Sequence, residues 1–289
     1  MTSVIISGAG GQLGKAFVER LSFKDGFNVF SFDRSQLDIA DLDKIHRTLS
    51  SLPKVKYWIN CAAYTQVDAA ETNEKEATLY NALAPGYLAR ACWEAGVHLF
   101  HFSSDYVYDN HLRRPLREDD ETSPKGIYAK TKLEGEQEII YSGASYTILR
   151  TSWVYGPGGN NFVNTMLRLG KTKEEINVVG DQLGAPTFTH DITDVIKELI
   201  TLHAEEQGDK IQGMFNFSNA GEVSWDDFSR TIFKHTSLLC KVNTITSAQF
   251  GAKAPRPAYS VLNCEKIAQL LSYQIPHWKD GLQRYLLLV

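Results

Sequence analysis

The feature that most constrains the fold is a glycine-rich turn near the start of the chain. The apolar run Val4–Ser7 leads directly into Gly8-Ala9-Gly10-Gly11-Gln12-Leu13-Gly14, which places glycines three residues apart where a first strand would turn into a first helix. Without Cβ atoms, such a backbone turns sharply and approaches a pyrophosphate, and the N–H groups at the helix start favour its charge. The pattern predicts a dinucleotide-binding site, with cofactor contacts from Gly8, Gly11, Gln12, Leu13 and Gly14.

Short apolar runs alternate with longer amphipathic stretches as far as Thr151. The runs are rich in β-branched and aromatic residues, which is typical of buried parallel strands, and the stretches between them are long enough for crossover helices. The expected strands are Val4–Ser7, Asn28–Asp33, Lys56–Asn60, His98–Ser103 and Tyr146–Thr151, and the expected helices are Gln12–Leu21, Leu42–Leu52, Thr78–Ala95 and Tyr128–Tyr141. This alternation predicts an α/β fold with a Rossmann-like, doubly wound parallel sheet.

The regular alternation ends after Thr151. Glycines and prolines, among them the run Gly156-Pro157-Gly158-Gly159, separate shorter and less periodic segments, which predicts a smaller C-terminal lobe. We expect residues 1–151 to form an NAD(P)-binding Rossmann domain, with a return to it around 187–203. Residues 152–186 and 204–289 are expected to form a substrate-binding lobe. Helices are expected there at Asp191–His203, Ser224–His235 and Cys264–Leu271.

Composition excludes several classes of partner. The 30 basic and 34 acidic side chains give a formal charge of −4, so the charge balance gives no electrostatic reason to expect nucleic acid or an acidic membrane as a partner. No apolar run approaches the roughly 18 residues that span a bilayer, and residues 1–8 do not resemble a signal peptide. The four scattered cysteines are expected to be free thiols. We therefore expect a cytoplasmic protein with no nucleic-acid or membrane partner.

The second expected strand ends in two charged residues that bear on the choice of cofactor. Asp33 lies about twenty residues beyond the glycines, where a carboxylate accepts hydrogen bonds from the ribose of NADH, although it could instead cap a turn. Arg34 could pair with the 2′-phosphate of NADPH, so both cofactors stay open. Further expected contacts are Asp38 and Ile39 near the adenine, and Cys61, Ala62, Ala63 and Tyr64, whose mostly small side chains would leave room for a cofactor or simply pack in the core.

Tyr128 and Lys132 carry the strongest chemical signal. Residues four apart share one face of a helix, so the phenol and the ammonium can point toward one reacting group. A nearby cation would make the phenol a better acid, because it favours the phenolate. This spacing also arises by chance, and it gains weight from the glycine-rich turn and from Ser104, which ends the fourth strand and can donate a hydrogen bond to a substrate carbonyl.

With these motifs, the chain resembles the dTDP-4-dehydrorhamnose reductases of the extended short-chain dehydrogenase/reductase family over nearly its whole length. The resemblance is carried by Gly8–Gly14, Cys61–Glu71, Ser103–Tyr108, Tyr128 with Lys132, Leu149–Gly156, Asn161–Val163, Asp181–Thr187 and Arg256-Pro257. It implies hydride transfer from NADPH or NADH to the 4-keto group of a dTDP-linked 6-deoxy-L-hexose, dTDP-4-dehydro-6-deoxy-L-mannose, which gives dTDP-L-rhamnose.

The same resemblance assigns roles to residues. Tyr128 would be the general acid, Lys132 would hold the nicotinamide ribose and lower the phenol pKa, and Ser104 would polarise the carbonyl from a position where the family usually has threonine. The substrate would be bound by Asp105, Tyr106, Trp153 and Arg256, the last at the diphosphate, with Thr65 and Asn161 as weaker candidates. Some relatives dimerise through a magnesium ion, but the ligand position is Ala16 here. We therefore predict no metal and leave a homodimer open.

Other functions compete with this interpretation. A ketoreductase for another nucleotide-linked deoxysugar would share every motif, because the product configuration depends on how the pocket presents the sugar. A dehydratase is disfavoured, since Tyr106 stands where such enzymes have glutamate. A regulatory subunit resembling that of methionine adenosyltransferase would not need Ser104, Tyr128 and Lys132. Trp225 and Trp278 are assigned to the core.

Overall fold

A parallel sheet of six strands forms the centre of the computed structural model, which describes residues 1–21, 26–108, 111–205 and 208–289. The strands are β1 (Thr2–Ser7), β2 (Phe27–Phe32), β3 (Val55–Asn60), β4 (His98–Ser104), β5 (Tyr146–Thr151) and β10 (Gly213–Asn216). Their order is β10-β5-β4-β3-β1-β2, and every neighbouring pair is parallel. The expected α/β fold with a Rossmann-like sheet is confirmed.

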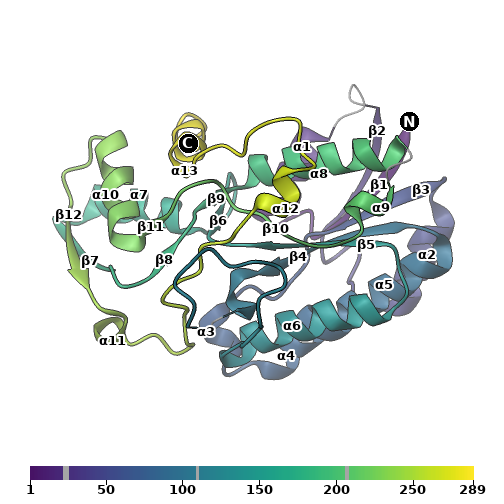
Figure 1. Ribbon diagram of the computed structural model, residues 1–289, viewed down its shortest axis with the longest axis horizontal. Coiled ribbons are helices and arrows are strands. Elements are labelled where there is room, and N and C mark those ends of the chain that lie inside the picture. The colour runs from purple at the N-terminus through teal and green to yellow at the C-terminus, as the bar shows by residue number, and fades with distance from the viewer. Residues whose placement is uncertain (22–25, 109–110, 206–207) are drawn as a thin grey trace.

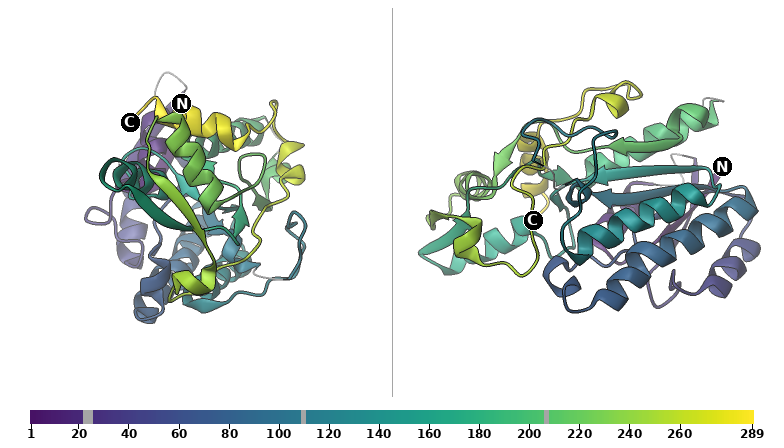
Figure 2. Two further views of the ribbon diagram at one scale, coloured as in Figure 1. Left: turned by 90° about the vertical axis from the view of Figure 1, so that its left-hand side faces the viewer. Right: turned by 60° about the horizontal axis from the view of Figure 1, so that its bottom comes forward.

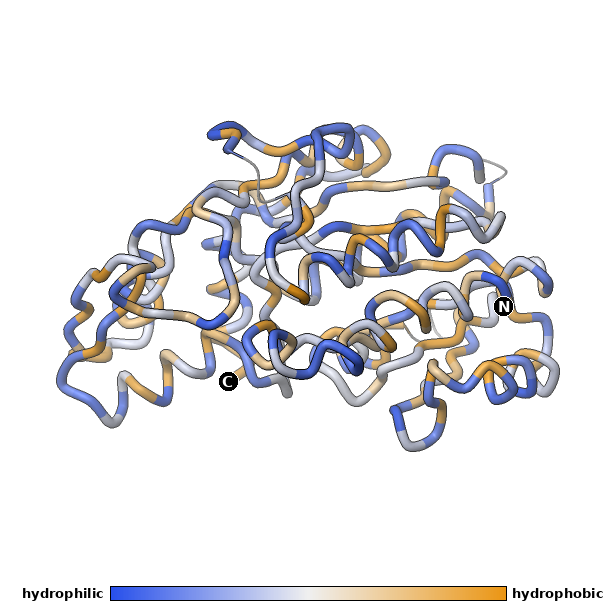
Figure 3. Tube along the Cα trace, turned by 90° about the horizontal axis from the view of Figure 1, so that it is seen from below, coloured by the Kyte–Doolittle hydropathy of each residue, from blue (hydrophilic) through white to orange (hydrophobic). Residues whose placement is uncertain are grey.

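Helices cover both faces of this sheet (Figure 1). Alternate residues of β1 point to opposite faces, so Val4 and Ile6 belong to one hydrophobic cluster and Ile5 to the other. The first cluster is covered by α1 (Gln12–Arg20) and α8 (Thr189–Ala204), and the second by α2 (Leu42–Ser51), α5 (Ala84–Ala95) and α6 (Gly126–Tyr141). Hydrophobic and hydrophilic residues alternate along the helices of the second face, as helices with one buried side require (Figure 3).

The expected single helix Thr78–Ala95 is divided in the structure. Its place is taken by α4 (Glu74–Thr78), the π-helical turn η2 (Leu79–Leu83) and α5. Pro85 lies in the first turn of α5, where its ring would clash with the carbonyl of Asn81 in a regular α-helix and where it has no N–H to donate. A π-helical turn accommodates such a proline by widening the backbone locally. The prediction of one continuous helix was therefore wrong.

The C-terminal part of the chain packs around a hydrophobic cluster of its own, away from the sheet (Figure 2). Its principal elements are α7 (Phe162–Thr172), β7 (Glu175–Val179), α10 (Trp225–His235), β12 (Lys241–Ile245) and α13 (Trp278–Leu286). Ser224 caps α10 by accepting a hydrogen bond from Asp227 N, as the sequence predicts for a helix that begins there. The shorter elements are α3 (Val67–Ala70), η3 (Asp105–Val107), β6 (Val154–Tyr155), β8 (Leu183–Gly184), β9 (Thr187–Phe188), α9 (Gly208–Ile211), β11 (Val223–Ser224), α11 (Ser247–Phe250) and α12 (Glu265–Ala268).

Two segments differ from the expected organisation. Strand β10 lies in the range 204–289 that we assigned to the lobe, yet it pairs with β5 and extends the sheet. Helix α12 has four residues, where the sequence suggested a helix over Cys264–Leu271. The division into a Rossmann domain and a lobe otherwise stays a prediction. Within the part of the chain that the structure describes, no helix is both long enough and apolar enough to cross a membrane.

Candidate active site

The glycine turn joins β1 to α1 and is tightly packed. Gly8 has a φ of 73°, and a Cβ added to it would lie 2.5 Å from the backbone nitrogen of Ala62. Gly11 N donates to Gly8 O at 3.0 Å, and no side chain caps the start of α1 at Gly11. The first N–H groups of the helix therefore remain available to an anion, which is the arrangement that binds a pyrophosphate.

A cleft of about 430 Å³ opens at this turn, where the strand order reverses between β1 and β3. The cleft brings together ten of the residues predicted to bind the cofactor: Gly8, Gly11, Asp33, Arg34, Asp38, Ile39, Cys61, Ala62, Ala63 and Tyr64. The three other residues of the glycine turn that were predicted to bind the cofactor do not line the cleft. Gln12 Nε2 donates to Val154 O at 3.1 Å, Leu13 packs against the hydrophobic cluster under α1, and Gly14 lies directly against the backbone of Gly8 and Ala9.

Polar side chains at one end of the cleft form a network that the sequence did not predict. Tyr80, from the π-helical turn, donates to Asp38 Oδ2 at 2.9 Å and accepts from Arg34 Nη2 at 2.7 Å. Asp33 Oδ1 accepts from the backbone and the hydroxyl of Ser35, and these hydrogen bonds lower the pKa of Asp33. The Asp33 carboxylate thus caps a turn, which was the alternative to ribose binding, and Arg34 is among the residues that line the cleft.

Ser104, Asp105, Tyr106 and Tyr128 meet at the carboxyl end of β4. Ser104 Oγ donates to Asp105 Oδ1 at 3.1 Å and accepts from Tyr106 N at 3.2 Å, while the Tyr106 ring meets the Tyr128 ring edge-on at 5.5 Å. Burial raises the pKa of Tyr128 to about 12, against the opposing effect of a hydrogen bond with Ser104. Burial also raises the pKa of Asp105 to about 7, although hydrogen bonds with Ser260 and Ser104 oppose this shift.

Lys132 lies four residues beyond Tyr128 in α6, but its ammonium points elsewhere. Its Nζ donates to Phe102 O at 2.6 Å and lies 3.4 Å from His101 Nε2. Burial lowers the pKa of Lys132 to about 8, although the carboxylate of Glu136 favours the charged form. Burial has the largest effect on the pKa of Tyr128 and raises it, while the ammonium of Lys132 faces β4, so the lowering of that pKa by Lys132 stays a prediction.

Trp153 has an unusual backbone and an aromatic partner. Its φ is 48°, which a bulky residue adopts only under constraint, and its ring stacks on Trp225 with centroids 3.3 Å apart. Trp225 also donates to Gln182 Oε1 at 3.1 Å. Trp225 packs against the hydrophobic cluster of the lobe, as expected for a core residue, and in addition it supplies the ring on which Trp153 stacks. Trp278 is 3% exposed and does lie in the core.

The remaining substrate candidates are Arg256, Asn161 and Thr65. Arg256 Nη1 and Nη2 donate to the carboxylate of Asp68 at 3.1 and 2.7 Å. Asn161 caps α7 by accepting from Asn164 N and donates to Gly156 O, so its side chain is occupied by local structure. Thr65 is exposed in the loop after β3. Of these three residues, Arg256 alone offers a charge for a diphosphate.

These features can be matched to known proteins. The family model described as the RmlD substrate binding domain matches residues 1–288. A dTDP-4-dehydrorhamnose reductase of Aggregatibacter actinomycetemcomitans is 37% identical over 98% of this chain and 98% of that protein. The chain belongs to this reductase family. The prediction of an oxidoreductase is thereby confirmed.

Further members of the family bear on cofactor and substrate. The crystal structure of the Bacillus anthracis reductase in complex with NADP has a TM-score of 0.94 and 36% identity, with 100% of both chains covered, so the expected class of cofactor is confirmed for the family. The spore coat polysaccharide biosynthesis protein SpsK of Bacillus subtilis is 37% identical over 99% of this chain and 97% of its own. A Streptomyces antibioticus protein named "Probable dTDP-4,6-dihydroxy-2-methyloxan-3-one 4-ketoreductase" is 35% identical over 96% of this chain and 92% of its own.

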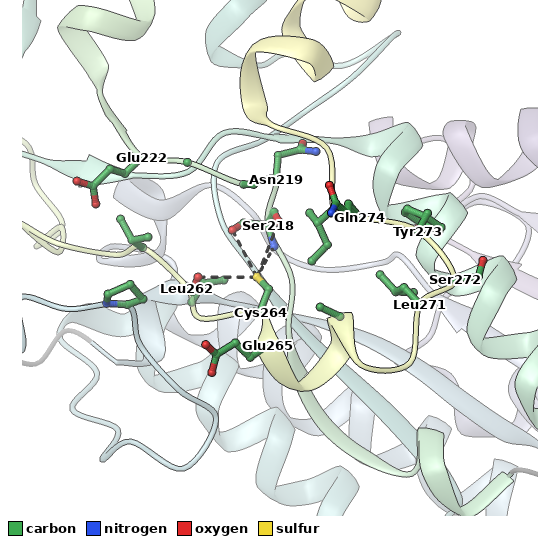
Figure 4. A pocket seen from close by; sticks show the side chains of 16 residues that line it. Ser218, Asn219, Glu222, Leu262, Cys264, Glu265, Leu271, Ser272, Tyr273 and Gln274 are labelled. Atoms are coloured by element: carbon green, nitrogen blue, oxygen red, sulfur yellow. Dashed lines mark hydrogen bonds between the residues drawn. The ribbon is translucent and has the colours of Figure 1, made fainter.

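A larger hollow, of about 810 Å³, is lined by other segments of the chain (Figure 4). Its walls come from the segments 218–222, 261–265 and 271–275, and none of the predicted site residues lines it. Ser218 N donates to the thiol of Cys264 at 3.3 Å, and burial raises the pKa of this thiol to about 11. A thiol in that state is a poor nucleophile, so the hollow does not compete with the cleft as a reaction site.

Proposed function

We propose that this protein reduces the 4-keto group of dTDP-4-dehydro-6-deoxy-L-mannose and so forms dTDP-L-rhamnose. The observation that carries the proposal is the meeting of Ser104 and Tyr128 at the carboxyl end of β4, beside a glycine-lined cleft suited to a dinucleotide. When bound, NADPH supplies the hydride. The chain's own groups orient the ketone, stabilise the negative charge that develops on its oxygen, and protonate that oxygen.

Ser104 and Tyr128 have separate roles in this proposal. Tyr128 Oη transfers its proton to the carbonyl oxygen, and its raised pKa keeps the phenol protonated, and therefore ready to donate, at neutral pH. Ser104 Oγ donates a hydrogen bond to the same oxygen. In the free protein that hydroxyl donates to Asp105, so substrate binding requires the Ser104 proton to turn from the carboxylate to the ketone.

We also propose that NADPH is preferred to NADH. Asp33 Oδ1 is engaged by Ser35 and Gln36 in a turn, which weakens the case for ribose recognition by this carboxylate. Arg34 lines the cleft and carries the charge that a 2′-phosphate would need. A comparison of kcat/KM for the two cofactors tests this preference directly, and equal values would contradict it.

The experiment that tests the main proposal is reduction of the ketosugar, generated in situ by an epimerase, by the wild type and by Tyr128→Phe. The wild type should consume NADPH and yield dTDP-L-rhamnose. The variant should lose about 10²–10⁴-fold in kcat, as expected for removal of a general acid, and should still bind NADPH. A variant with unchanged kcat would exclude Tyr128 as the acid.

A second candidate is reduction of a different dTDP-linked ketosugar, which is favoured by the similarity to the Streptomyces antibioticus ketoreductase. The catalytic groups would be the same, and the product would differ in configuration at C4 or in its ring substituents. Product identification by NMR separates the two candidates. Binding of NADPH without reduction of any ketosugar would instead favour a regulatory role.

A further inference from the structure

Two indole rings lie stacked just beyond the carboxyl end of β5. Trp153 follows Thr151 by two residues, and Thr151 is the register partner of Ser104 in β4. The chain therefore brings Trp153 to the same edge of the sheet as Ser104 and Tyr128. Its ring lies on the ring of Trp225, the first residue of α10, with centroids 3.3 Å apart and planes 8° from parallel. Both side chains are partly buried.

The position of the Trp153 ring is imposed by its surroundings. A φ of 48° is costly for a bulky residue, and aromatic pairs prefer offset or edge-on arrangements to a face-to-face overlap. Gly184 of β8 lies against the same ring, because a Cβ added there would be 2.5 Å from Trp153 Cε2. The ring is thus covered by Trp225 and has no room to turn toward Gly184. Strain of this kind persists only where neighbouring groups enforce it.

Trp225 is itself held in place, by a hydrogen bond and by packing. Its Nε1–H donates to Gln182 Oε1 at 3.1 Å, and Gln182 Nε2 donates to Ser247 Oγ at 2.9 Å. An indole N–H can only donate, which fixes the orientation of the Gln182 amide. Phe162 packs against the same indole, with ring centroids 4.4 Å apart. Trp225 therefore provides a fixed surface on which the Trp153 ring rests.

Strand β8 connects the indole pair to the polar groups at the end of β4. Ser260 N donates to Leu183 O of β8 at 2.8 Å, and a hydrogen bond with Ser260 lowers the pKa of Asp105 against the effect of burial. Asp105 in turn accepts from Ser104. The groups that hold the indole pair and the groups proposed to act on the ketone thus belong to one connected part of the structure.

We propose that Trp225, held by Gln182, is a positioning residue that fixes the indole of Trp153 as one wall of the sugar site. The proposal deepens the proposed function, because it assumes that Trp153 contacts the sugar ring of the dTDP-linked substrate. A wall that is already in place reduces the ordering that binding must supply. It also favours one presentation of the sugar over others, on which the selection between ketosugars depends.

The direct test follows the Trp153 ring in the free protein. In protein labelled with ¹³C-tryptophan, its ring-proton signals are assigned by their loss in Trp153→Phe. Protons above the face of another aromatic ring are shifted upfield, so these signals should move downfield in Trp225→Leu. Trp225→Phe retains a ring and should keep most of the upfield shift. Trp278→Phe, in the same hydrophobic cluster, is the control and should leave the Trp153 signals in place. Unchanged Trp153 signals in Trp225→Leu would overturn the proposal.

Steady-state kinetics shows what the fixed ring does for the substrate. Trp225→Leu should raise the KM for the ketosugar by about 3–10-fold, which corresponds to the ordering of one side chain, with the Kd for NADPH unchanged and kcat within a few-fold. Trp225→Phe should have a KM close to that of the wild type. A purely structural role would instead lower the midpoint of thermal unfolding in both Trp225→Leu and Trp278→Phe and raise KM in neither. An unchanged KM in an active Trp225→Leu enzyme would refute the role in substrate binding.

The wild type offers a test that does not require the variants to fold. Nuclear Overhauser effects between the rings of Trp153 and Trp225 should be present in the free protein. They should persist when dTDP-L-rhamnose is added with NADP⁺, while the Trp153 signals shift. Loss of these effects on binding would contradict the proposal, because Trp153 would then have left its partner. If dTDP-L-rhamnose does not bind but the ring contacts and the Trp225→Leu shifts are as expected, the proposed function has failed and the fixing of Trp153 by Trp225 is retained.

Discussion

Lys132 is a buried cation whose burial destabilises the free protein. Its pKa is lowered to about 8 in the fold, against about 10.4 in an unfolded chain. Between these values the unfolded state binds more protons than the folded state, so the free energy of unfolding rises with pH. Below pH 8 the full destabilisation by the buried charge is present, and above about pH 10.4 it is lost.

Lys132→Met should therefore be more stable than the wild type at pH 7, by about 2–3 kcal/mol. The difference should shrink steadily as the pH rises from 8 toward 10. Urea unfolding at pH 7, 9 and 10 measures it. Lys130→Met, which changes an exposed lysine of the same helix, is the matched control and should show no such trend. A Lys132 variant that is less stable than the wild type at pH 7 would contradict this account of the buried charge.

Substitutions at Ser104 test whether its hydroxyl polarises the substrate carbonyl. Ser104→Ala removes the donor, and kcat should fall by about 10²–10³-fold, the usual loss when one such donor is deleted. Because Ser104 does not line the cofactor cleft, the Kd for NADPH should change little. Ser104→Thr restores the hydroxyl and should keep kcat within a few-fold of the wild type. If Ser104→Ala weakened NADPH binding as strongly as it lowered kcat, the residue would be holding the cofactor and not the ketone.

The π-helical turn η2 positions Tyr80, which lines the cofactor cleft, and Asn81, which is buried and holds the backbone of a lining residue, Tyr64. It directs the Tyr80 hydroxyl to Asp38 and Arg34, and it places Asn81 where its amide both donates to and accepts from the backbone of Tyr64 at 2.9 Å. In a regular α-helix, the same side chains would be rotated about the helix axis by a fraction of a turn. We infer that the widened turn shapes the cleft.

Tyr80→Phe should weaken NADPH binding by about 3–10-fold, since it removes one hydroxyl that holds the two charged side chains at the cleft. The kcat should be unchanged because the reacting groups lie at β4. Isothermal titration gives the Kd, and Tyr141→Phe, at a tyrosine that is 84% exposed, provides the control. Equal affinity in the wild type and Tyr80→Phe would show that the network does not support the cofactor.

The elements that sequence reasoning found are those with strong local signals. Strands β1 to β5 are almost continuously apolar, so their predicted ends lie within one residue of the observed ends for β3 to β5 and within two for β1. Strand β10 (Gly213–Asn216) has four residues and takes its place at the sheet edge by pairing with β5. Nothing local marks such a segment, because the pairing partner lies more than sixty residues away in the sequence.

The candidate site could also be predicted only in part, where local motifs mark it. Motifs located the glycine turn, Ser104 and Tyr128, because their chemistry depends on residue type and spacing. The contacts of Tyr80 with Arg34 and of Trp225 with Trp153 were missed because each involves a partner distant in sequence. The direction in which the Lys132 side chain points depends on the packing of α6 against β4. A single sequence contains no direct signal for such tertiary contacts.

At the scale of the whole molecule, the ion pair of Arg256 with Asp68 joins the lobe to α3, beside the sheet. Arg256 and Asp68 lie 188 residues apart in sequence, and their side chains are 20% and 44% exposed. The hydrogen bonds of Arg256 hold the pKa of Asp68 below its usual range. A pair this exposed contributes about 1 kcal/mol or less to stability, so its position matters more than its energy. We propose that it holds the cation that binds the diphosphate of the substrate.

Arg256→Ala should raise the KM for the sugar nucleotide by about 10–100-fold, the loss expected for hydrogen bonds to a charged group, and leave the Kd for NADPH unchanged. Asp68→Asn breaks the ion pair but keeps the cation, so its KM should stay within a few-fold of the wild type. The contrast separates two roles for Arg256. If it binds the diphosphate, the two variants differ in KM; if it only ties the lobe to the sheet, both raise KM equally and lower the midpoint of thermal unfolding together. Steady-state kinetics at fixed NADPH, with a melting curve for each variant, distinguishes these outcomes.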